Sequence, residues 1–220
     1  MTGKIKRFWI REPFCGLSHG IGAALSVVAL VVLLVLADGK LWQTISFAVF
    51  GVSLIVLYTA STLYHSLWVK PKQILQLMRF DHVAIFLLIA GTYAPVCLVS
   101  LRGAWGWSLF GVEYGLAVIG IVCSLVWKGF PDWARIGIYV IMGWLIMIAI
   151  VPTIHVLGLA GLAWLFGGGA AYSIGTVVFA TDRPHLWPGK FSAHDLWHLF
   201  VLAGSACHFV LMAVVIAPML

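Results

Sequence analysis

The chain has 220 residues, of which 63% are hydrophobic and only 9% are charged, and its mean hydropathy is +1.08. Soluble domains carry about a quarter charged residues, so this composition excludes an ordinary soluble globular protein. The formal net charge is +6. In a membrane protein the placement of basic residues reports topology, so we do not take this charge as the sign of a nucleic-acid partner.

Runs of roughly 20 apolar residues predict helices that span a lipid bilayer. The sequence has seven such runs, at about 19–37, 42–68, 81–101, 108–127, 135–152, 158–180 and 194–216. The connections between them are short, which predicts a single domain over residues 1–220. We therefore expect an all-α, seven-transmembrane helix bundle that follows a short basic tail at residues 1–18.

The basic residues are distributed unevenly over the predicted connections. Eleven of them fall on the side of the N-terminus: Lys4, Lys6, Arg7, Arg11, Lys70, Lys72, Arg79, Lys128, Arg135, Arg183 and Lys190. Only Lys40 and Arg102 fall on the other side. Because loops rich in Lys and Arg stay in the cytoplasm, this asymmetry predicts a cytoplasmic N-terminus and a C-terminus outside.

Histidines recur at helical spacing at the predicted cytoplasmic ends of two helices. Residues four apart share a helix face, so Ser61 points with His65, and His194 points with His198. The second helix ends near His65 and the seventh begins near His194, which places both groups at one depth. Three imidazoles and the carboxylate of Asp81 could converge there and bind zinc in tetrahedral geometry. The alternative is a set of interfacial histidines hydrogen-bonded to neighbouring helices.

Asp81 and Ser61 are the candidate catalytic residues. Asp81 lies at the predicted start of the third helix, where it could orient, or accept a proton from, a water activated by the metal. Ser61 could donate a hydrogen bond to a developing oxyanion. In the alternative, Asp81 only stabilises the first turn of its helix through the helix dipole, and the Ser61 hydroxyl bonds back to the carbonyl of residue 57.

Other residues receive structural interpretations. His194-Asp195-Leu196-Trp197-His198 imitates the H-E-x-x-H zinc motif, but Ser192 and Asp195 have capping-box spacing, and we favour a helix cap. The cysteines are scattered without paired spacing, which predicts structural thiols rather than disulfides or thiolate ligands: Cys15, Cys97, Cys123 and Cys207.

Two further features concern the packing of the predicted helices. Pro95 should kink the third helix, and Gly167, Gly168 and Gly169 should allow close approach to the sixth. Glu113 and His208 are each about fourteen residues, roughly 21 Å, from the cytoplasmic ends of their helices. Each needs a polar partner at that depth, and we expect them to find either one another or a trapped water.

Three motifs together resemble those of a known family. Ser61-x-x-x-His65, Asp81 in FDHVAIFLLIAGTYAPV, and His194-x-x-x-His198 are similar to the motifs of the hemolysin III and progestin/adipoQ receptor family, which is grouped with the alkaline ceramidases. The resemblance extends from about Ser18 to the end of the chain. It implies a multi-pass protein of the bacterial plasma membrane, with zinc held by the three histidines and with Asp81 and Ser61 beside it.

Three functions follow from this sequence. The first is a zinc-dependent intramembrane hydrolase that acts on a lipid amide or related acyl bond. The second is a receptor-like regulator of membrane lipid homeostasis in which zinc is structural and a lipid is the ligand. The third is the pore-forming cytolysin that the hemolysin name suggests. A pore needs a continuous polar lining, and the predicted helices carry isolated polar residues instead.

Overall fold

The computed structural model describes residues 10–187 and 190–219. Over these residues the chain is helical, and its only extended pairing is an isolated bridge between Trp187 and Phe191. The basic tail residues Lys4, Lys6 and Arg7 lie outside the described part. The all-α fold expected from the sequence is therefore confirmed.

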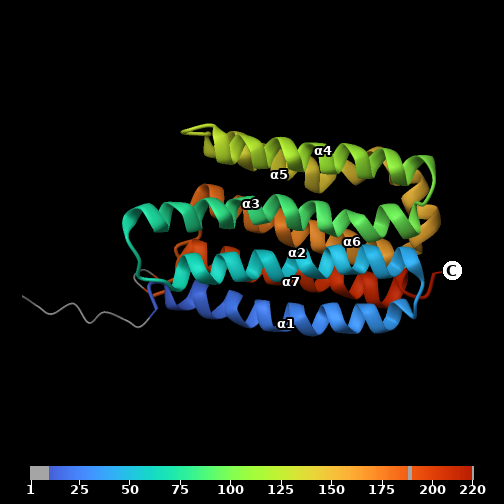
Figure 1. Ribbon diagram of the computed structural model, residues 1–220, viewed down its shortest axis with the longest axis horizontal. Coiled ribbons are helices and arrows are strands. Elements are labelled where there is room, and N and C mark those ends of the chain that lie inside the picture. The colour runs from blue at the N-terminus through green and yellow to red at the C-terminus, as the bar shows by residue number, and fades with distance from the viewer. Residues whose placement is uncertain (1–9, 188–189, 220) are drawn as a thin grey trace, which may run out of the picture.

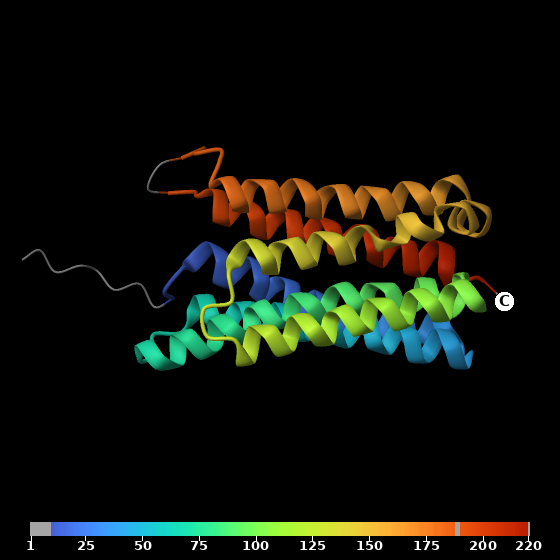
Figure 2. The same cartoon turned by 90° about the horizontal axis from the view of Figure 1, so that it is seen from above.

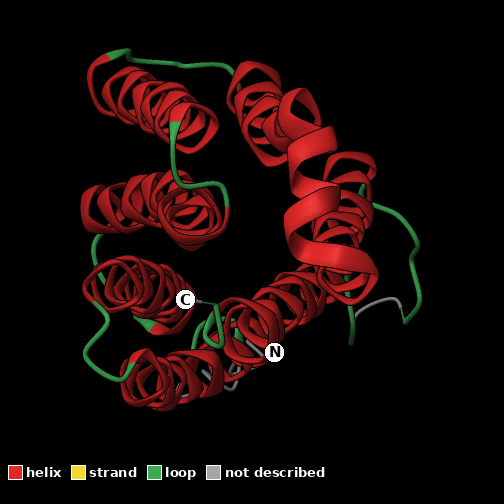
Figure 3. Cartoon of the chain, turned by 90° about the vertical axis from the view of Figure 1, so that its right-hand side faces the viewer, coloured by secondary structure: helices red, strands yellow, loops and turns green. Residues whose placement is uncertain are grey.

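The helices run side by side along one common direction (Figures 1 and 3). In chain order they are α1 (Pro13–Ala37), α2 (Leu41–Ser66), α3 (Pro71–Pro95), η1 (Val96–Ser100), α4 (Ala104–Val126), α5 (Asp132–Trp144), η2 (Leu145–Ala149), α6 (Ile150–Thr181), α7 (Ala193–Val210) and η3 (Leu211–Ile216). The elements η1 and η3 are π-helical extensions of α3 and α7, and η2 is a 3-10 segment between α5 and α6.

Six helical segments of the described chain are long and apolar enough to cross a membrane. One of them, Asp132–Thr181, contains 50 residues and would be roughly 75 Å long as a straight helix, far beyond a hydrocarbon core of about 30 Å. It is not straight, because Gly158 adopts φ 61°, a left-handed conformation that glycine tolerates. Figure 2 shows the yellow and orange parts of this segment lying next to each other, so the chain turns back on itself there.

The surface of the bundle is apolar and polar side chains are buried inside it. Leu17 is 56% exposed, Val28 58% and Val177 62%, whereas Ser46 and Thr153 are fully buried. A soluble protein keeps such polar groups mostly at its surface. The inversion fits a bundle whose outer face contacts lipid.

The third helix begins ten residues earlier than the sequence predicted, at Pro71 rather than Asp81. Proline is favoured in the first turn of a helix, and the Lys70 amide donates to the Gln73 side chain at 3.1 Å. The first turns of α3 carry too many polar residues to belong to an apolar run, which is why the hydropathy pattern missed them. Asp81 is thus inside α3 and cannot act as a first-turn residue on the helix dipole, whose effect fades within one turn. The first helix also starts early, at Pro13, so the predicted tail at 1–18 was too long.

The prediction of close helix contact at the glycine run is confirmed in part, and the kink expected at Pro95 stays a prediction. At Pro95 the α-helical bonding of α3 gives way to the π-helix η1. The absence of a side chain at Gly168 leaves room for the imidazole of His208, which packs against it from α7. Gly169, in contrast, has no atom within 4 Å of where its Cβ would be, so only part of the glycine run serves close helix contact.

The structure does not pair Glu113 with His208. His208 Nδ1 lies 2.9 Å from the carbonyl oxygen of Gly204, and its ring stacks on Tyr172 with centroids 5.6 Å apart. Neither carboxylate oxygen of Glu113 has a hydrogen-bond partner among the described residues. A similar predicted depth was therefore not enough to make them hydrogen-bond partners.

Candidate metal centre

Three helices bring four potential metal donors together at one end of the bundle. His65 lies in the last turn of α2, His194 and His198 lie at the start of α7, and Cys15 lies in the first turn of α1. One ligand atom from each of these residues lies within 4.8 Å of all the others. The three histidines predicted as ligands from their spacing are therefore neighbours in the structure.

The two histidines of α7 form the closest pair. Their Nε2 atoms are 3.2 Å apart, because the one-turn spacing stacks both rings on one helix face. In tetrahedral zinc sites with Zn–N bonds of about 2.0–2.1 Å, two nitrogen ligands are separated by roughly 3.3 Å. The pair has the spacing of one edge of such a tetrahedron.

His65 completes the triangle of imidazoles. Its ring centroid lies 4.7 Å from that of His198 and 5.2 Å from that of His194. Its Nδ1 atom contacts the Glu12 carboxylate, which leaves Nε2 as the nitrogen available to a metal. This hydrogen bond from His65 is the main reason that the pKa of Glu12 is lowered, with smaller contributions from the charges of Arg11 and His194, while partial burial acts in the opposite direction. Glu12 is therefore an ionised acceptor at neutral pH.

Asp81 and Ser61 lie beside this group. Ser61 and Asp81 both line the cavity next to the histidines, and Asp81 is near enough to interact with Ser61 and with His65. Ser61 is 2% exposed, and Asp81 is half-buried. The ligand atoms that cluster belong to Cys15, His65, His194 and His198, and the role of Asp81 beside them stays a prediction.

Cys15 was missed by the sequence analysis, which treated it as a structural thiol. It is buried, and its Sγ lies 3.1 Å from Oδ1 of Asp195 as well as within the donor cluster. The available signal was its spacing of four residues from His19, which is also buried and lies with its ring centroid 3.9 Å from that of His198. Neither interaction could be inferred without knowing how α1 packs against α7.

Asp195 acts as the predicted helix cap. Its carboxylate accepts bonds from the amide and the hydroxyl of Ser192, both at 2.8 Å, and its own amide donates to the Ser192 hydroxyl at 3.1 Å. This reciprocal capping box fixes the first turn of α7, and with it the direction of His194 and His198. Asp195 therefore supports the centre through the helix rather than as a metalloprotease-type base.

The chemistry of the donors fits a zinc ion. Three imidazoles converge with no carboxylate inside the triangle, and His198 has a buried Nδ1 without a hydrogen-bond partner among the described residues. Zinc binds histidine nitrogen and cysteine sulfur readily, and its catalytic sites combine three protein ligands with one open position. His65, His194 and His198 would supply the three nitrogens, and the thiol of Cys15 lies near enough to be a fourth donor.

A cavity of about 170 Å³ leads away from the centre. At the metal end it is lined by Ser61, Asp81 and His194, and at the far end it reaches Val96 and His208. Val96, the first residue of η1, follows Asp81 of α3 by fifteen residues, which corresponds to roughly 22 Å of helix. Between the two ends the lining is mostly aliphatic and aromatic. The cavity therefore joins a polar end at the histidines to a long apolar region.

The cavity is not sealed from the side of the bundle. Val140 and Trp144 of α5 line it, and these residues are 42% and 38% exposed. Across from them, Ser173 of α6 accepts a hydrogen bond from the Trp144 indole at 3.0 Å. Helices α5 and α6 thus form one wall of the cavity, and part of that wall is exposed on the outside of the bundle.

A bundle of apolar helices enclosing a histidine cluster defines an integral membrane protein with a candidate metal site. Residues 8–209 match the family model described as Haemolysin-III related, and the chain belongs to that family. It is 40% identical over 223 residues to Hemolysin-3 of Bacillus cereus, covering 99% of each chain. It is 41% identical over 206 residues to the Hemolysin-3 homolog of Bacillus subtilis (strain 168), covering 92% and 93%.

A more distant relative comes from animals. The human Monocyte to macrophage differentiation factor is 25% identical over 172 residues, which cover 76% of this chain and 69% of the human protein. The family recognised from the three sequence motifs is thereby confirmed.

Proposed function

We propose that this protein is a zinc-dependent hydrolase that cleaves an amide or related acyl bond of a membrane lipid. The observation that carries the proposal is the continuity between the histidine cluster, the Ser61–Asp81 pair and the long apolar cavity. An acyl chain fits the apolar part of the cavity, and its carbonyl group would then lie at the polar end.

In this proposal His65, His194 and His198 hold the zinc ion. Bound zinc would supply a water of lowered pKa and polarise the substrate carbonyl. Asp81 would accept the proton of the attacking water, and Ser61, which lines the same end of the cavity, would donate a hydrogen bond to the developing oxyanion. The oxygen of that water adds to the acyl carbon, the C–N bond breaks, and the proton held by Asp81 passes to the leaving amine. The products are a fatty acid and an amine.

The arrangement in the membrane is part of the proposal. The chain would cross the membrane seven times, with Asp132–Thr181 contributing two crossings divided at Gly158. The positive-inside asymmetry puts the N-terminus and the histidine cluster on the cytoplasmic side of a bacterial plasma membrane, and the C-terminus outside. The relatives named Hemolysin-3 come from Bacillus species, which supports the bacterial setting.

A second candidate is a regulator of membrane lipid homeostasis in which zinc is structural. Cys15 favours it, because a thiolate beside three imidazoles would fill all four positions of a tetrahedral site. A closed site leaves no position for water, and the cavity would then bind a lipid as a ligand. The cytolysin suggested by the relatives' names ranks third, since the cavity beside the histidines has a mostly apolar lining rather than a polar one.

The test is hydrolysis by the purified protein in lipid nanodiscs. Ceramides and N-acyl amides of several chain lengths are offered, and release of the fatty acid is measured before chelation, after chelation and after zinc is restored. The proposal requires release that stops on chelation and returns with zinc. Hydrolysis that is indifferent to chelation would contradict it, and zinc binding without hydrolysis of any lipid would favour the regulator.

A further inference from the structure

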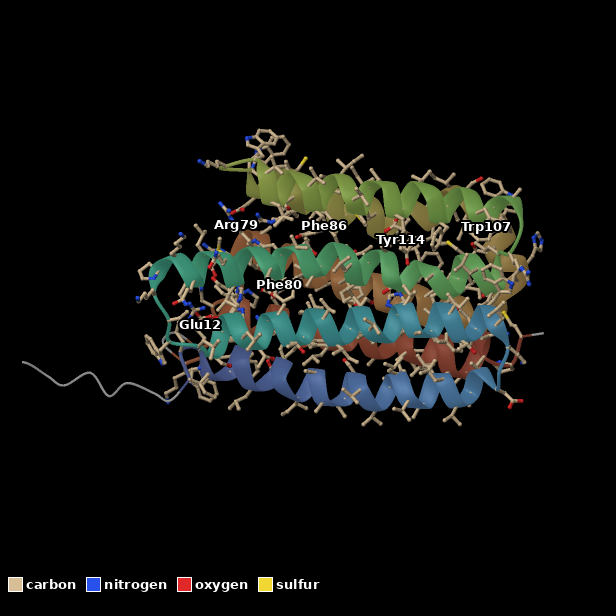
Figure 4. The ribbon with its side chains drawn as sticks, in the orientation of Figure 1. Glu12, Arg79, Phe80, Phe86, Trp107 and Tyr114 are labelled. Carbon is tan, nitrogen blue, oxygen red and sulfur yellow. The ribbon has the colours of Figure 1, made fainter. Side chains whose placement is uncertain are left out.

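The two residues before α1 bind the end of α2. The Glu12 amide donates to the His65 carbonyl at 2.9 Å, and the Arg11 amide donates to the Ser66 carbonyl at 3.3 Å. The Arg11 guanidinium donates to the Tyr64 carbonyl at 2.5 Å and lies 4.6 Å from the centre of the Tyr64 ring. Figure 4 labels Glu12 at this end of the bundle.

These bonds have a clear structural reason. The last carbonyl groups of a helix have no partner within the helix and must be satisfied by other groups. Here three successive carbonyls, those of Tyr64, His65 and Ser66, are satisfied by the segment Arg11–Glu12. The backbone of Glu12 is therefore held next to His65, whatever conformation the Glu12 side chain adopts.

The Glu12 side chain is fixed at both of its oxygens. One oxygen, Oε2, contacts His65 Nδ1, and the other, Oε1, lies 3.3 Å from Nε of Arg11. A surface glutamate would otherwise move freely, and the Glu12 side chain is 45% exposed. The geometry aims this carboxylate at one ring nitrogen of a histidine whose side chain is 2% exposed.

We propose that Glu12 is the positioning residue of the metal centre: its carboxylate holds His65 in the tautomer that carries hydrogen on Nδ1. A neutral imidazole has one N–H and one lone pair, so a donor bond from Nδ1 leaves the lone pair on Nε2, which faces the other two histidines. Carboxylates that orient a metal-binding histidine in this way typically raise metal affinity by 10- to 100-fold. The inference rests on the metal site of the proposed function.

The other two histidines do not share this arrangement. His198 Nδ1 has no partner among the described residues, and His194 pairs only with His198 through Nε2. The nearby carboxylate of Asp195 binds Cys15 and Ser192 instead. Within the described chain, Glu12 is thus the acidic residue that contacts an imidazole of the cluster, and His65 should depend on it most.

Zinc affinity of the Glu12→Gln variant tests the assignment. Glutamine keeps the length of the side chain and leaves both backbone bonds intact, but it removes the charge that favours Nδ1–H. Affinity is measured at fixed pH by competition with a chromogenic chelator, and we expect a loss of about 10- to 100-fold. The matched control is Asp132→Asn, which removes a carboxylate from an ion pair with Arg135 at the same end of the bundle and should leave zinc affinity unchanged.

A second readout separates positioning from simple folding. Nitrogen-15 spectra of the metal-free protein, labelled at histidine, should contain a signal from the Nδ1–H tautomer of His65. The signal is assigned to His65 because it disappears in the His65→Ala variant. That signal should weaken in Glu12→Gln while the melting temperature without metal stays near that of wild type.

The results distinguish a failure of the Glu12 assignment from a failure of the metal site itself. If wild type binds zinc and Glu12→Gln binds it equally well, Glu12 serves only as a helix cap and the inference is overturned, while the metal site remains. If wild type binds no zinc at all, the proposed function and the inference fail together.

Discussion

The Nε2 atoms of His194 and His198 lie 3.2 Å apart on the first turns of α7, and the ring of His65 faces both from α2. A metal bound here would join α2 to α7. The nearest ligands on these two helices, His65 and His194, are 129 residues apart in the chain. Because an ion that binds only the folded state stabilises it, metal content and thermal stability should be linked.

Chelation should therefore lower the melting temperature of the wild-type protein. A ligand present at 1,000 times its dissociation constant contributes about 4 kcal/mol to the free energy of unfolding. Differential scanning fluorimetry in detergent, with a strong chelator and with added zinc, measures the shift. The His198→Ala variant should melt at the lower temperature under both conditions. A variant that still responded to zinc would show that the stabilising ion binds elsewhere.

Asp81→Asn should retain zinc and lose hydrolysis by about 100-fold or more, because the amide cannot accept the proton of the attacking water. Zinc content and fatty-acid release are measured on the same preparation. Asp195→Asn is the comparison, since it weakens a helix cap worth about 1 kcal/mol and leaves the proton acceptor in place. Equal hydrolysis by Asp81→Asn and wild type would remove Asp81 from its assigned role.

Filling the cavity should block the acyl chain without disturbing the metal. Gly169 lines the cavity and has no atom within 4 Å of where its Cβ would be, so the side chain of Gly169→Leu would enter the open space. We expect hydrolysis of long-chain substrates to fall at least tenfold while zinc content is unchanged. Gly111→Leu on α4 is a matched control, because it has equal space at its Cβ and lies outside the cavity lining. Equal loss in both variants would mean that the cavity is not the substrate site.

The donor at the fourth position distinguishes the two leading functions. The hydrolase account predicts three nitrogen donors and one oxygen donor, with Cys15 remaining a thiol bonded to Asp195. X-ray absorption spectroscopy of the zinc protein can detect a sulfur donor by its longer bond of about 2.3 Å. A sulfur signal that disappears in Cys15→Ser would identify a closed site and support structural zinc.

The membrane arrangement can be tested at the C-terminus. The proposed arrangement, with seven crossings from a cytoplasmic N-terminus, would put the C-terminal end of the chain outside the plasma membrane. A C-terminal alkaline phosphatase fusion should be active in cells of a Gram-negative host, and a green fluorescent protein fusion at the same place should be dark. A bright fluorescent fusion would mean an even number of crossings or an inverted bundle.

The histidine cluster could be predicted from the sequence because it depends on spacings within single helices. Two i, i+4 pairs near helix ends determine the shared face, and the apolar runs determine the depth. Hydropathy could not predict the start of α3 at Pro71, since the polar first turns of that helix leave the apolar run. Asp81 was consequently placed at a helix start, although it does line the same cavity as Ser61.

The rest of the site depends on packing between helices. Glu12 and Cys15 join the cluster only because α1 begins at Pro13 and lies against the ends of α2 and α7. No spacing within the sequence reports that contact. The same limit applies to Glu113 and His208, for which the sequence left open a mutual pair or a trapped water, and which do not bond to each other in the structure.

Zinc content of the purified protein tests the central claim most directly. Inductively coupled plasma mass spectrometry of wild type should give one zinc ion per chain. The His65→Ala and His198→Ala variants should contain almost none, while His155→Ala, which alters an exposed histidine, should match wild type. Full zinc occupancy in the His65→Ala and His198→Ala variants would contradict the assigned site.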